Sequence, residues 1–141
     1  MLFKLKRCYN LQKEKPMQSK LEHINLTVRD TDATAKILSH IFDWKIRWAG
    51  AAKDNGRTIH LGGEDTYLAL YSHRDKHLAD TSHKTITHLN HIGILVDDLD
   101  KTEQKIKESG FDTFNHGDYE PGKRFYFDLE DGIEIEVVSY Q

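Results

Sequence analysis

The sequence predicts an α+β fold in which two β-α-β-β-β modules in tandem form one curved mixed sheet around a cleft, with the helices outside. An internal repeat supports this prediction, because "LEHINLTVRDTD" at 21–32 returns as "LNHIGILVDDLD" at 89–100. At an offset of 68, the two copies share seven of the fourteen residues that start at position 21. In both copies, apolar residues alternate with polar ones and then recur at helical spacing, which indicates a strand followed by a helix.

The first copy, over about 20–72, supplies one strand, one helix and three further strands. Asp32 stands where a helix N-cap belongs, because its carboxylate can accept hydrogen bonds from the first free backbone N–H groups. Apolar residues continue at helical spacing to Phe42. A further strand is expected at 45–51, and the segment 56–72 is typical of a hairpin around a Gly-Gly pair.

The second copy, over about 88–140, repeats this order. Asp100 is expected to cap its helix, which has few apolar residues and should therefore pack less deeply than the first helix. A strand is expected at 111–117, followed by a hairpin at 122–139 that turns at an Asp-Gly pair. The segment 73–87 links the two modules.

Length and charge restrict the class of protein. The 141 residues are enough for one domain, placed at 19–141, after a basic N-terminal extension at 1–18. The net charge of −3 gives no basic field for nucleic acid, and no apolar run is long enough to cross a membrane. A single cysteine, Cys8, excludes a disulfide framework and fits the reducing cytoplasm.

Two histidines occupy the same position in the repeat. Alternation along the strands puts His23 and His91 on the cleft side, where equivalent positions converge on a pseudo-twofold axis. Glu136 faces the cleft from the last strand, and its counterpart in the first module is Ala69. Two imidazoles and one carboxylate on one side of a divalent transition metal leave other coordination positions free. These residues therefore predict a metal site made of His23, His91 and Glu136.

Other polar and aromatic side chains are expected around the cleft. Substrate-binding candidates are Asn25, Tyr67, Tyr71, Arg124 and Phe127. Candidates for an acid or base near bound substrate are Tyr67, His60 and Tyr126.

The turn before the last strand leaves one choice open. A four-residue turn would put Phe125 and Phe127 beside Glu136, whereas a bulge would put Arg124 and Tyr126 there. Aromatic residues at such positions are more often core residues than pocket walls.

These segments resemble the vicinal oxygen chelate superfamily, which includes glyoxalase I, extradiol dioxygenases, fosfomycin-resistance thiol transferases and bleomycin-resistance proteins. The resemblance covers about 20–140 and rests on "LEHINLTVRD", "LNHIGILVDD" and "FYFDLEDGIEIEVV". It implies that His23, His91 and Glu136 bind a divalent ion such as Fe, Mn, Zn or Ni. Glyoxalase I commonly has a fourth ligand where this sequence has Ala69, so the pattern is closer to extradiol dioxygenases or fosfomycin-modifying enzymes.

We expect a small cytoplasmic homodimer. The resemblance implies that it acts on an oxygen-bearing small molecule by Lewis-acid chemistry, with ring-cleaving dioxygenation as the sharper hypothesis. The site could lie within one chain or be completed by exchange of modules between two chains. The alternative is a binding module, similar to bleomycin-resistance proteins, that sequesters a small molecule without catalysis. The retained ligand set favours the enzyme.

Overall fold

The computed structural model describes residues 19–75, 77 and 86–141, so the basic extension and most of the linker lie outside the described residues. Both modules have the predicted β-α-β-β-β order. Module 1 contains β1 (His23–Thr27), α1 (Thr31–Phe42), β2 (Lys45–Ala51), the 3-10 turn η1 (Lys53–Asn55), β3 (Arg57–Gly62) and β4 (Tyr67–Ser72). Module 2 contains β5 (Ile92–Leu95), α2 (Leu99–Glu108), β6 (Thr113–Tyr119), β7 (Gly122–Leu129), the 3-10 turn η2 (Glu130–Gly132) and β8 (Ile133–Ser139).

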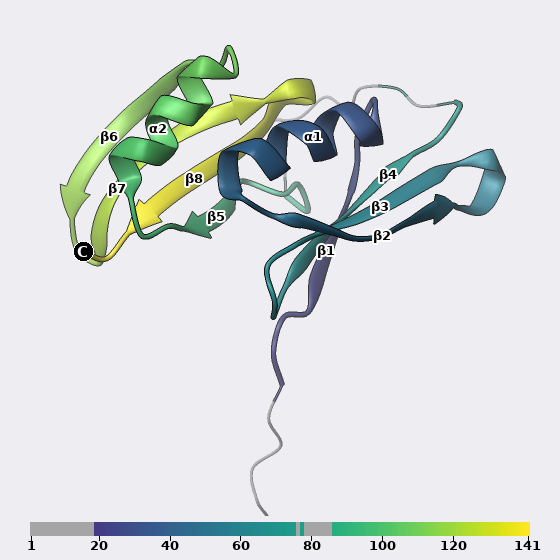
Figure 1. The fold of residues 1–141 in the computed structure, drawn as a ribbon, viewed down its shortest axis with the longest axis horizontal. Helices are drawn as coiled ribbons and strands as arrows, with labels where there is room; N and C mark the ends of the chain where they lie inside the picture. Colours follow the sequence, from purple (N-terminus) through teal and green to yellow (C-terminus); the bar gives the residue numbers. More distant parts are fainter. Residues whose placement is uncertain (1–18, 76, 78–85) are drawn as a thin grey trace, which may run out of the picture.

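The two sheets have the same topology. Their strand orders are β1-β4-β3-β2 and β5-β8-β7-β6, and in each the first strand runs parallel to the last while the other pairs are antiparallel. Within the described residues these are two separate four-stranded sheets, so the predicted single sheet is divided in one chain (Figure 1). The strands β1 and β5 each form an edge of their own sheet, so each could lie against a strand of another module.

The helices begin two residues earlier than predicted. The side chain of Asp30 accepts hydrogen bonds from the backbone N–H groups of Asp32 and Ala33, and Asp98 accepts from Lys101. Both capping residues have extended backbone angles, as an N-cap requires. The N-cap assignment to Asp32 and Asp100 was therefore wrong, although the repeat of the signal was correct.

Each helix covers one face of its own sheet, and we call the opposite face the front face. The helix α1 buries five residues against the core, whereas α2 buries two, Thr102 and Ile106. The shallower packing predicted for the second helix is confirmed. The core consists of the apolar rows of the strands together with these helix residues, among them Leu38, Ile41, Leu61, Leu70, Ile106, Phe125, Phe127, Ile135 and Val137.

Contacts between charged side chains join the two modules of one chain. The Nζ of Lys105, on α2, lies 2.9 Å from both carboxylate oxygens of Asp43, at the end of α1. Asp131, before β8, accepts hydrogen bonds from the backbone N–H of Arg29 at 2.9 Å and from its Nε at 3.0 Å. Figure 1 shows the two helices on the same side of the molecule, with the sheets spread away from each other.

The two hairpins differ by one residue in their loops. Gly62 pairs with Tyr67 across four loop residues, whereas Leu129 pairs with Ile133 across three. Because side chains alternate along a strand, this difference changes which residues of β7 share a face with β8. The structure shows the alternative in which Arg124 and Tyr126 share the face of Glu136.

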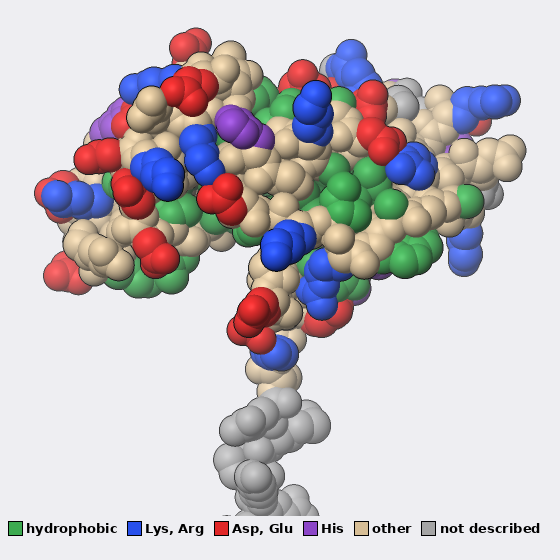
Figure 2. Space-filling model, viewed as in Figure 1, with side chains coloured by type: hydrophobic (Ala, Val, Ile, Leu, Met, Phe, Trp, Pro, Cys, Tyr) green, Lys and Arg blue, Asp and Glu red, His purple; other side chains and the backbone are tan. Residues whose placement is uncertain are grey.

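The surface carries both signs of charge. Figure 2 shows acidic and basic side chains interspersed over the visible face, over α2 as well as over module 1. No helix in the described part of the chain is long and apolar enough to span a membrane.

Candidate functional site

Glu136 is the centre of a polar cluster on the front face of module 2. Its side chain is only 13% exposed. The Nη1 of Arg124 donates to its Oε1 at 2.9 Å, and the Nε2 of His91 lies 3.1 Å from its Oε2. The two carboxylate oxygens therefore have different partners, one on each side of the strand.

His91 stands just before β5 and has an acceptor at each ring nitrogen. The Oδ1 of Asn90 lies 2.7 Å from its Nδ1, and Glu136 faces its Nε2. Both oxygens can only accept, so a neutral imidazole with one N–H can satisfy only one of them. A second proton or a divalent cation at Nε2 satisfies the other. A histidine with its Nδ1 held by an acceptor is the usual arrangement of a metal ligand, so this donor set fits a metal ion.

The space beside the carboxylate is left open by a glycine. Gly93 is the register partner of Glu136, and a Cβ there would lie 3.9 Å from Oε2. The ring of Tyr126 meets that of His91 edge-on, with centroids 5.9 Å apart. Burial raises the pKa of the Tyr126 phenol, and the nearby Glu136 carboxylate raises it further. The phenol is therefore protonated at neutral pH and can donate a hydrogen bond into the site.

His23 lies on the front face of module 1 within a row of rings. Its side chain is 45% exposed, its Nδ1 contacts Glu22, and its ring stacks on Tyr67 with centroids 5.0 Å apart. The row continues from Tyr67 to His60 at 4.8 Å and from His60 to Trp48 at 5.3 Å. Burial and the charge of Glu22 raise the pKa of Tyr67, so this phenol is also a donor at neutral pH.

The register supports the predicted equivalence of Ala69 and Glu136. Ala69 pairs with Asn25 on β1 and with His60 on β3. Glu136 pairs with the corresponding strands of module 2, β5 and β7. Ala69 is 2% exposed, and its methyl side chain has no atom that could bind a metal.

The chain does not bring the three predicted ligands together. His91 and Glu136 are in contact, whereas the ring contacts of His23 are within module 1. Among the described residues, no group of three or more histidine, cysteine or acidic side chains is placed to hold one ion.

The remaining predicted site residues divide between front face and core. Asn25 is exposed on β1, and Tyr71 donates from its hydroxyl to the backbone oxygen of Lys53 at 3.3 Å. Phe127 is fully buried and packs against the rings of Phe42 and Phe111. Its assignment to substrate binding was wrong, because the three-residue loop turns it towards the helix side.

Sequence reasoning missed Asn90, which fixes the ring of His91. A signal for it was present, since each copy of the repeat places an acceptor side chain directly before its histidine, Glu22 in one and Asn90 in the other. In module 2, an acceptor beside Nδ1 orients the ring and leaves Nε2 directed at the Glu136 carboxylate.

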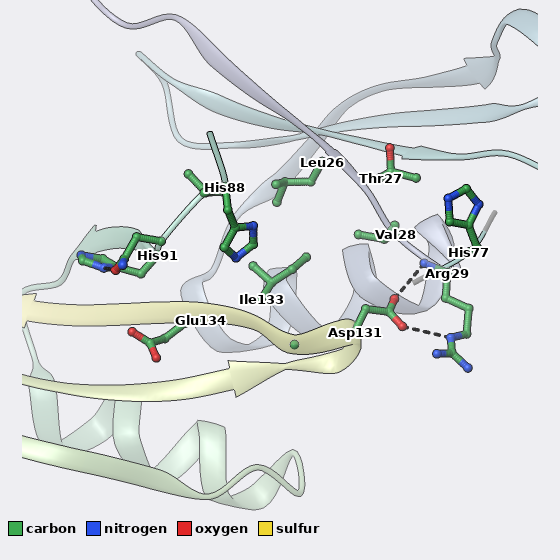
Figure 3. Close-up of a pocket in the computed structure, with 13 residues that line it drawn as sticks. Leu26, Thr27, Val28, Arg29, His77, His88, His91, Asp131, Ile133 and Glu134 are labelled. Atoms are coloured by element: carbon green, nitrogen blue, oxygen red, sulfur yellow. Dashed lines mark hydrogen bonds and ion pairs between the residues drawn. The ribbon is translucent and has the colours of Figure 1, made fainter. Parts of the chain in front are cut away.

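A cavity of about 640 Å³ lies between the modules of one chain. Figure 3 shows Leu26, Val28 and Ile133 directed into it, with the Arg29–Asp131 ion pair at one end. His91 lines its other end, so the cavity adjoins the module 2 cluster.

Comparisons with known proteins agree with this architecture. Residues 20–137 match the Glyoxalase/Bleomycin resistance protein/Dioxygenase superfamily. A glyoxylase/bleomycin resistance protein/dioxygenase domain from Frankia sp. EAN1pec superposes with a TM-score of 0.76 and 24% identity, over 89% of this chain and 100% of that chain. The fosfomycin resistance protein FosX from Mesorhizobium loti has a TM-score of 0.67 and 25% identity, over 86% and 92%.

A FosX variant from Listeria monocytogenes, in complex with Mn(II) and 1S,2S-dihydroxypropylphosphonic acid, has a TM-score of 0.69 and 21% identity, over 86% of this chain and 93% of that chain. A comparison with curated proteins gives no match. The similarity to solved structures thus spans nearly the whole length of each of these chains.

Proposed function

Because the chain belongs to the Glyoxalase/Bleomycin resistance protein/Dioxygenase superfamily, we propose that it is a homodimeric metalloenzyme for a small oxygen-bearing substrate. Its divalent ion is held by His91 and Glu136 of one subunit and by His23 of the partner subunit. We place the protein in the cytoplasm, because a single cysteine fits a reducing compartment.

The contact between His91 and Glu136 is the main support for the metal. The Nε2 of His91 lies 3.1 Å from the Oε2 of Glu136, whose side chain is 13% exposed. A buried carboxylate is costly unless it is paired or bound to a cation. Arg124 accounts for one of its oxygens, which leaves Oε2 and the Nε2 of His91 as the two atoms of this pair that would hold a divalent ion.

Exchange of modules between two chains explains the separation of His23 from the other ligands. His23 is exposed on the front face of module 1, and the His91–Glu136 pair lies on the front face of module 2. In one chain these two faces belong to separate sheets whose first strands are both edges. A second copy that sets its module 1 against module 2 of the first forms the continuous curved sheet and brings the three ligands together twice per dimer.

The chain's own residues define what the site can do. A divalent ion supplies Lewis-acid stabilisation of negative charge on substrate oxygens. The protonated phenols of Tyr126 and Tyr67 donate hydrogen bonds to such charge, and His60, beside Tyr67, can accept or return a proton. Asn25 and Tyr71 lie on the same front face as His23 and can orient the substrate.

Ala69 distinguishes between the chemistries of the superfamily. A three-ligand set leaves more coordination positions to substrate than a four-ligand set does. This favours reactions in which two substrate oxygens, or a diol and dioxygen, bind together, such as extradiol ring cleavage with Fe or Mn. The FosX complex with Mn(II) and a dihydroxy phosphonic acid supports the general class, with Zn and Ni as further possible ions.

A second candidate is a binding protein that sequesters a small aromatic compound. The row of rings from His23 to Trp48, the latter 50% exposed, favours it, because planar rings bind well against such a surface. In this case binding would not depend on a metal.

Metal analysis of the full chain tests the proposal. The protein is purified without oxygen, its mass in solution is measured, and divalent ions are quantified before and after chelation. We expect a dimer with one ion per chain, and oxygen uptake or product formation with catechols or fosfomycin as probes only in the metal-loaded form. A monomer without metal affinity contradicts the proposal, and metal-independent ligand binding without turnover supports sequestration instead.

A further inference from the structure

Arg124 was expected to bind substrate, but its guanidinium is directed at the protein's own carboxylate. We propose that Arg124 is a positioning residue that fixes Glu136 as a one-oxygen metal ligand, an inference that rests on the metal site proposed above. It assigns the arginine a role in how the ion is held rather than in substrate recognition.

The Arg124–Glu136 contact is nearly shielded from solvent. The side chains are 11% and 13% exposed, and Nη1 lies 2.9 Å from Oε1. A charge-assisted hydrogen bond of this kind is stronger and more directional than one between neutral groups. The carboxylate is therefore held in one rotation about its last bond.

Contacts with Gly122, Tyr119 and Tyr126 also hold the guanidinium in place. Its Nε and Nη2 lie 3.4 and 3.3 Å from the backbone oxygen of Gly122, both as donors. Its Cζ lies 4.5 Å from the centroid of the Tyr119 ring. Because the planar guanidinium is fixed on two sides, it cannot turn to follow an incoming anion without losing these contacts.

The consequence lies at the second oxygen of Glu136. With Oε1 bonded to Arg124, Oε2 is the oxygen directed towards His91 Nε2, beside Gly93, and the phenol of Tyr126 is a further partner of the carboxylate. A carboxylate that is free to rotate can bind an ion through both oxygens and so occupy two coordination positions. Arg124 prevents this and keeps one more position available to substrate.

Module 1 lacks both members of the pair. By register, the position equivalent to Glu136 is Ala69, and the position equivalent to Arg124 is Thr58, which pairs with Tyr71 as Arg124 pairs with Val138. The module that has the carboxylate also has the arginine, and the module that lacks one lacks the other. This is expected of a residue whose role is to support that carboxylate. A substrate-binding arginine would have no need to be adjacent to it.

Two effects of the arginine on the ion have opposite signs. Its charge repels the cation, whereas its hydrogen bond orients the ligand. Loss of an outer-shell partner typically weakens metal binding by about 10- to 100-fold. Since the charge of Arg124 is already compensated by Glu136, we expect the orienting effect to dominate.

The test compares Arg124→Met, Arg124→Lys and Tyr119→Leu in the full-length dimer, with Mn(II) affinity measured by competition with a chelator. Arg124→Met should weaken Mn(II) binding by about 10- to 100-fold. Arg124→Lys should have an intermediate effect on Mn(II) affinity, and Tyr119→Leu, which removes only the ring contact, should have the smallest effect. Melting temperatures of the metal-free proteins identify any general loss of folding. The spectrum of the Co(II) form should also change in Arg124→Met, since the coordination number changes.

Unchanged or tighter Mn(II) binding in a folded Arg124→Met variant overturns the inference. Glu136→Gln distinguishes this failure from failure of the proposed function. If Glu136→Gln loses Mn(II) while Arg124→Met does not, the site stands and the arginine has another role. If neither loses Mn(II), the proposed metal site is itself wrong.

Discussion

Module 1 and module 2 have the same strand order and helix position, yet they carry different chemistry at the same point of the sheet. Module 2 has the carboxylate of Glu136 with its arginine, whereas module 1 has Ala69 and a row of aromatic rings. The difference shows that the repeat has not produced two equal half-sites. In the proposed site, module 2 would provide the anionic ligand and module 1 a histidine and a ring surface, so the proposal needs one module of each kind.

The two helices also differ in polarity at equivalent positions. Ala35 of α1 is buried at 1% exposure, and the repeat aligns it with Glu103 of α2. Glu103 instead accepts hydrogen bonds from Thr113 and contacts His116 and Lys107. Module 1 is thus held together mainly by apolar packing, and module 2 in part by a charged cluster.

The largest expected effect concerns the carboxylate that module 1 lacks. Glu136→Gln should weaken metal binding by more than about 100-fold, because it removes the anionic ligand itself. Loss of a residue that only supports a ligand typically costs about 10- to 100-fold. The matched control is Glu134→Gln, two residues away on the same face, which should bind metal almost as the parent does. Chelator competition on both variants gives the answer. If Glu134→Gln is the variant that loses metal, the ligand assignment moves by two residues.

Ala69→Glu makes module 1 resemble module 2. Ala69 is 2% exposed, so a carboxylate there lacks solvent and should lower the free energy of unfolding of the metal-free protein by about 1–3 kcal/mol. With metal, the new ligand should tighten binding and reduce any reaction that needs two open positions. Ala69→Gln is the control for size. Metal affinity that is the same in Ala69→Glu and in the parent would show that residue 69 does not face the ion.

The charged cluster of α2 should make stability depend on pH. Burial opposes ionisation of Glu103, but hydrogen bonds from Lys107, Thr113 and His116 outweigh it and lower the pKa from 4.5 to about 2. Since the folded state favours the ionised form, the contribution is present above about pH 4.5 and is lost as the pH falls towards 2. For a partly exposed group we expect about 1–2 kcal/mol.

Urea unfolding of the parent and of Glu103→Gln between pH 2 and 7 measures this contribution. The variant should be less stable at neutral pH and should show a flatter profile below pH 4.5. Glu64→Gln, in the exposed loop between β3 and β4, serves as the control and should follow the parent. Parallel profiles for the parent and Glu103→Gln would show that the cluster does not stabilise module 2.

The smallest effect is expected at the contact between the modules. Arg29→Met removes the Nε bond to Asp131 but keeps the backbone bond, so the free energy of unfolding should fall by about 1 kcal/mol or less. Arg57→Met, which breaks the Arg57–Asp32 pair inside module 1, is the matched control. Only Arg29→Met should alter the relative motion of the modules in hydrogen exchange. Equal exchange at the junction in both variants would contradict a joining role for Arg29.

The repeat was sufficient to predict the tandem modules, because strand alternation and helical spacing are local properties of the sequence. Alternation along the strands also put His91 and Glu136 on the same face, where the structure has them in contact, while their role as metal ligands stays a prediction. Which side chains of β7 face the front could not be predicted, because a difference of one residue in the loop before β8 exchanges the two faces of the strand. For this reason Phe127 was assigned to the cleft although it belongs to the core.

The separation of His23 from the other two predicted ligands could not be inferred from the sequence either. It depends on how the modules are held in one chain, through contacts such as Lys105–Asp43 that join residues far apart in sequence. No local pattern specifies such contacts. The repeat predicts which residues are equivalent but not whether equivalent residues meet within a chain or between two chains.

A mixed dimer tests most directly whether module 1 of one chain completes the site on module 2 of another. Chains carrying His23→Ala and chains carrying Glu136→Gln are prepared separately, and each homodimer should bind little metal. After refolding together, the heterodimer contains one site with neither ligand and one site with all three. We predict that it binds one tightly held ion per dimer, at the parent's affinity. A heterodimer that binds no more metal than the two homodimers would contradict exchange of modules, because each site would then lack a ligand from its own chain.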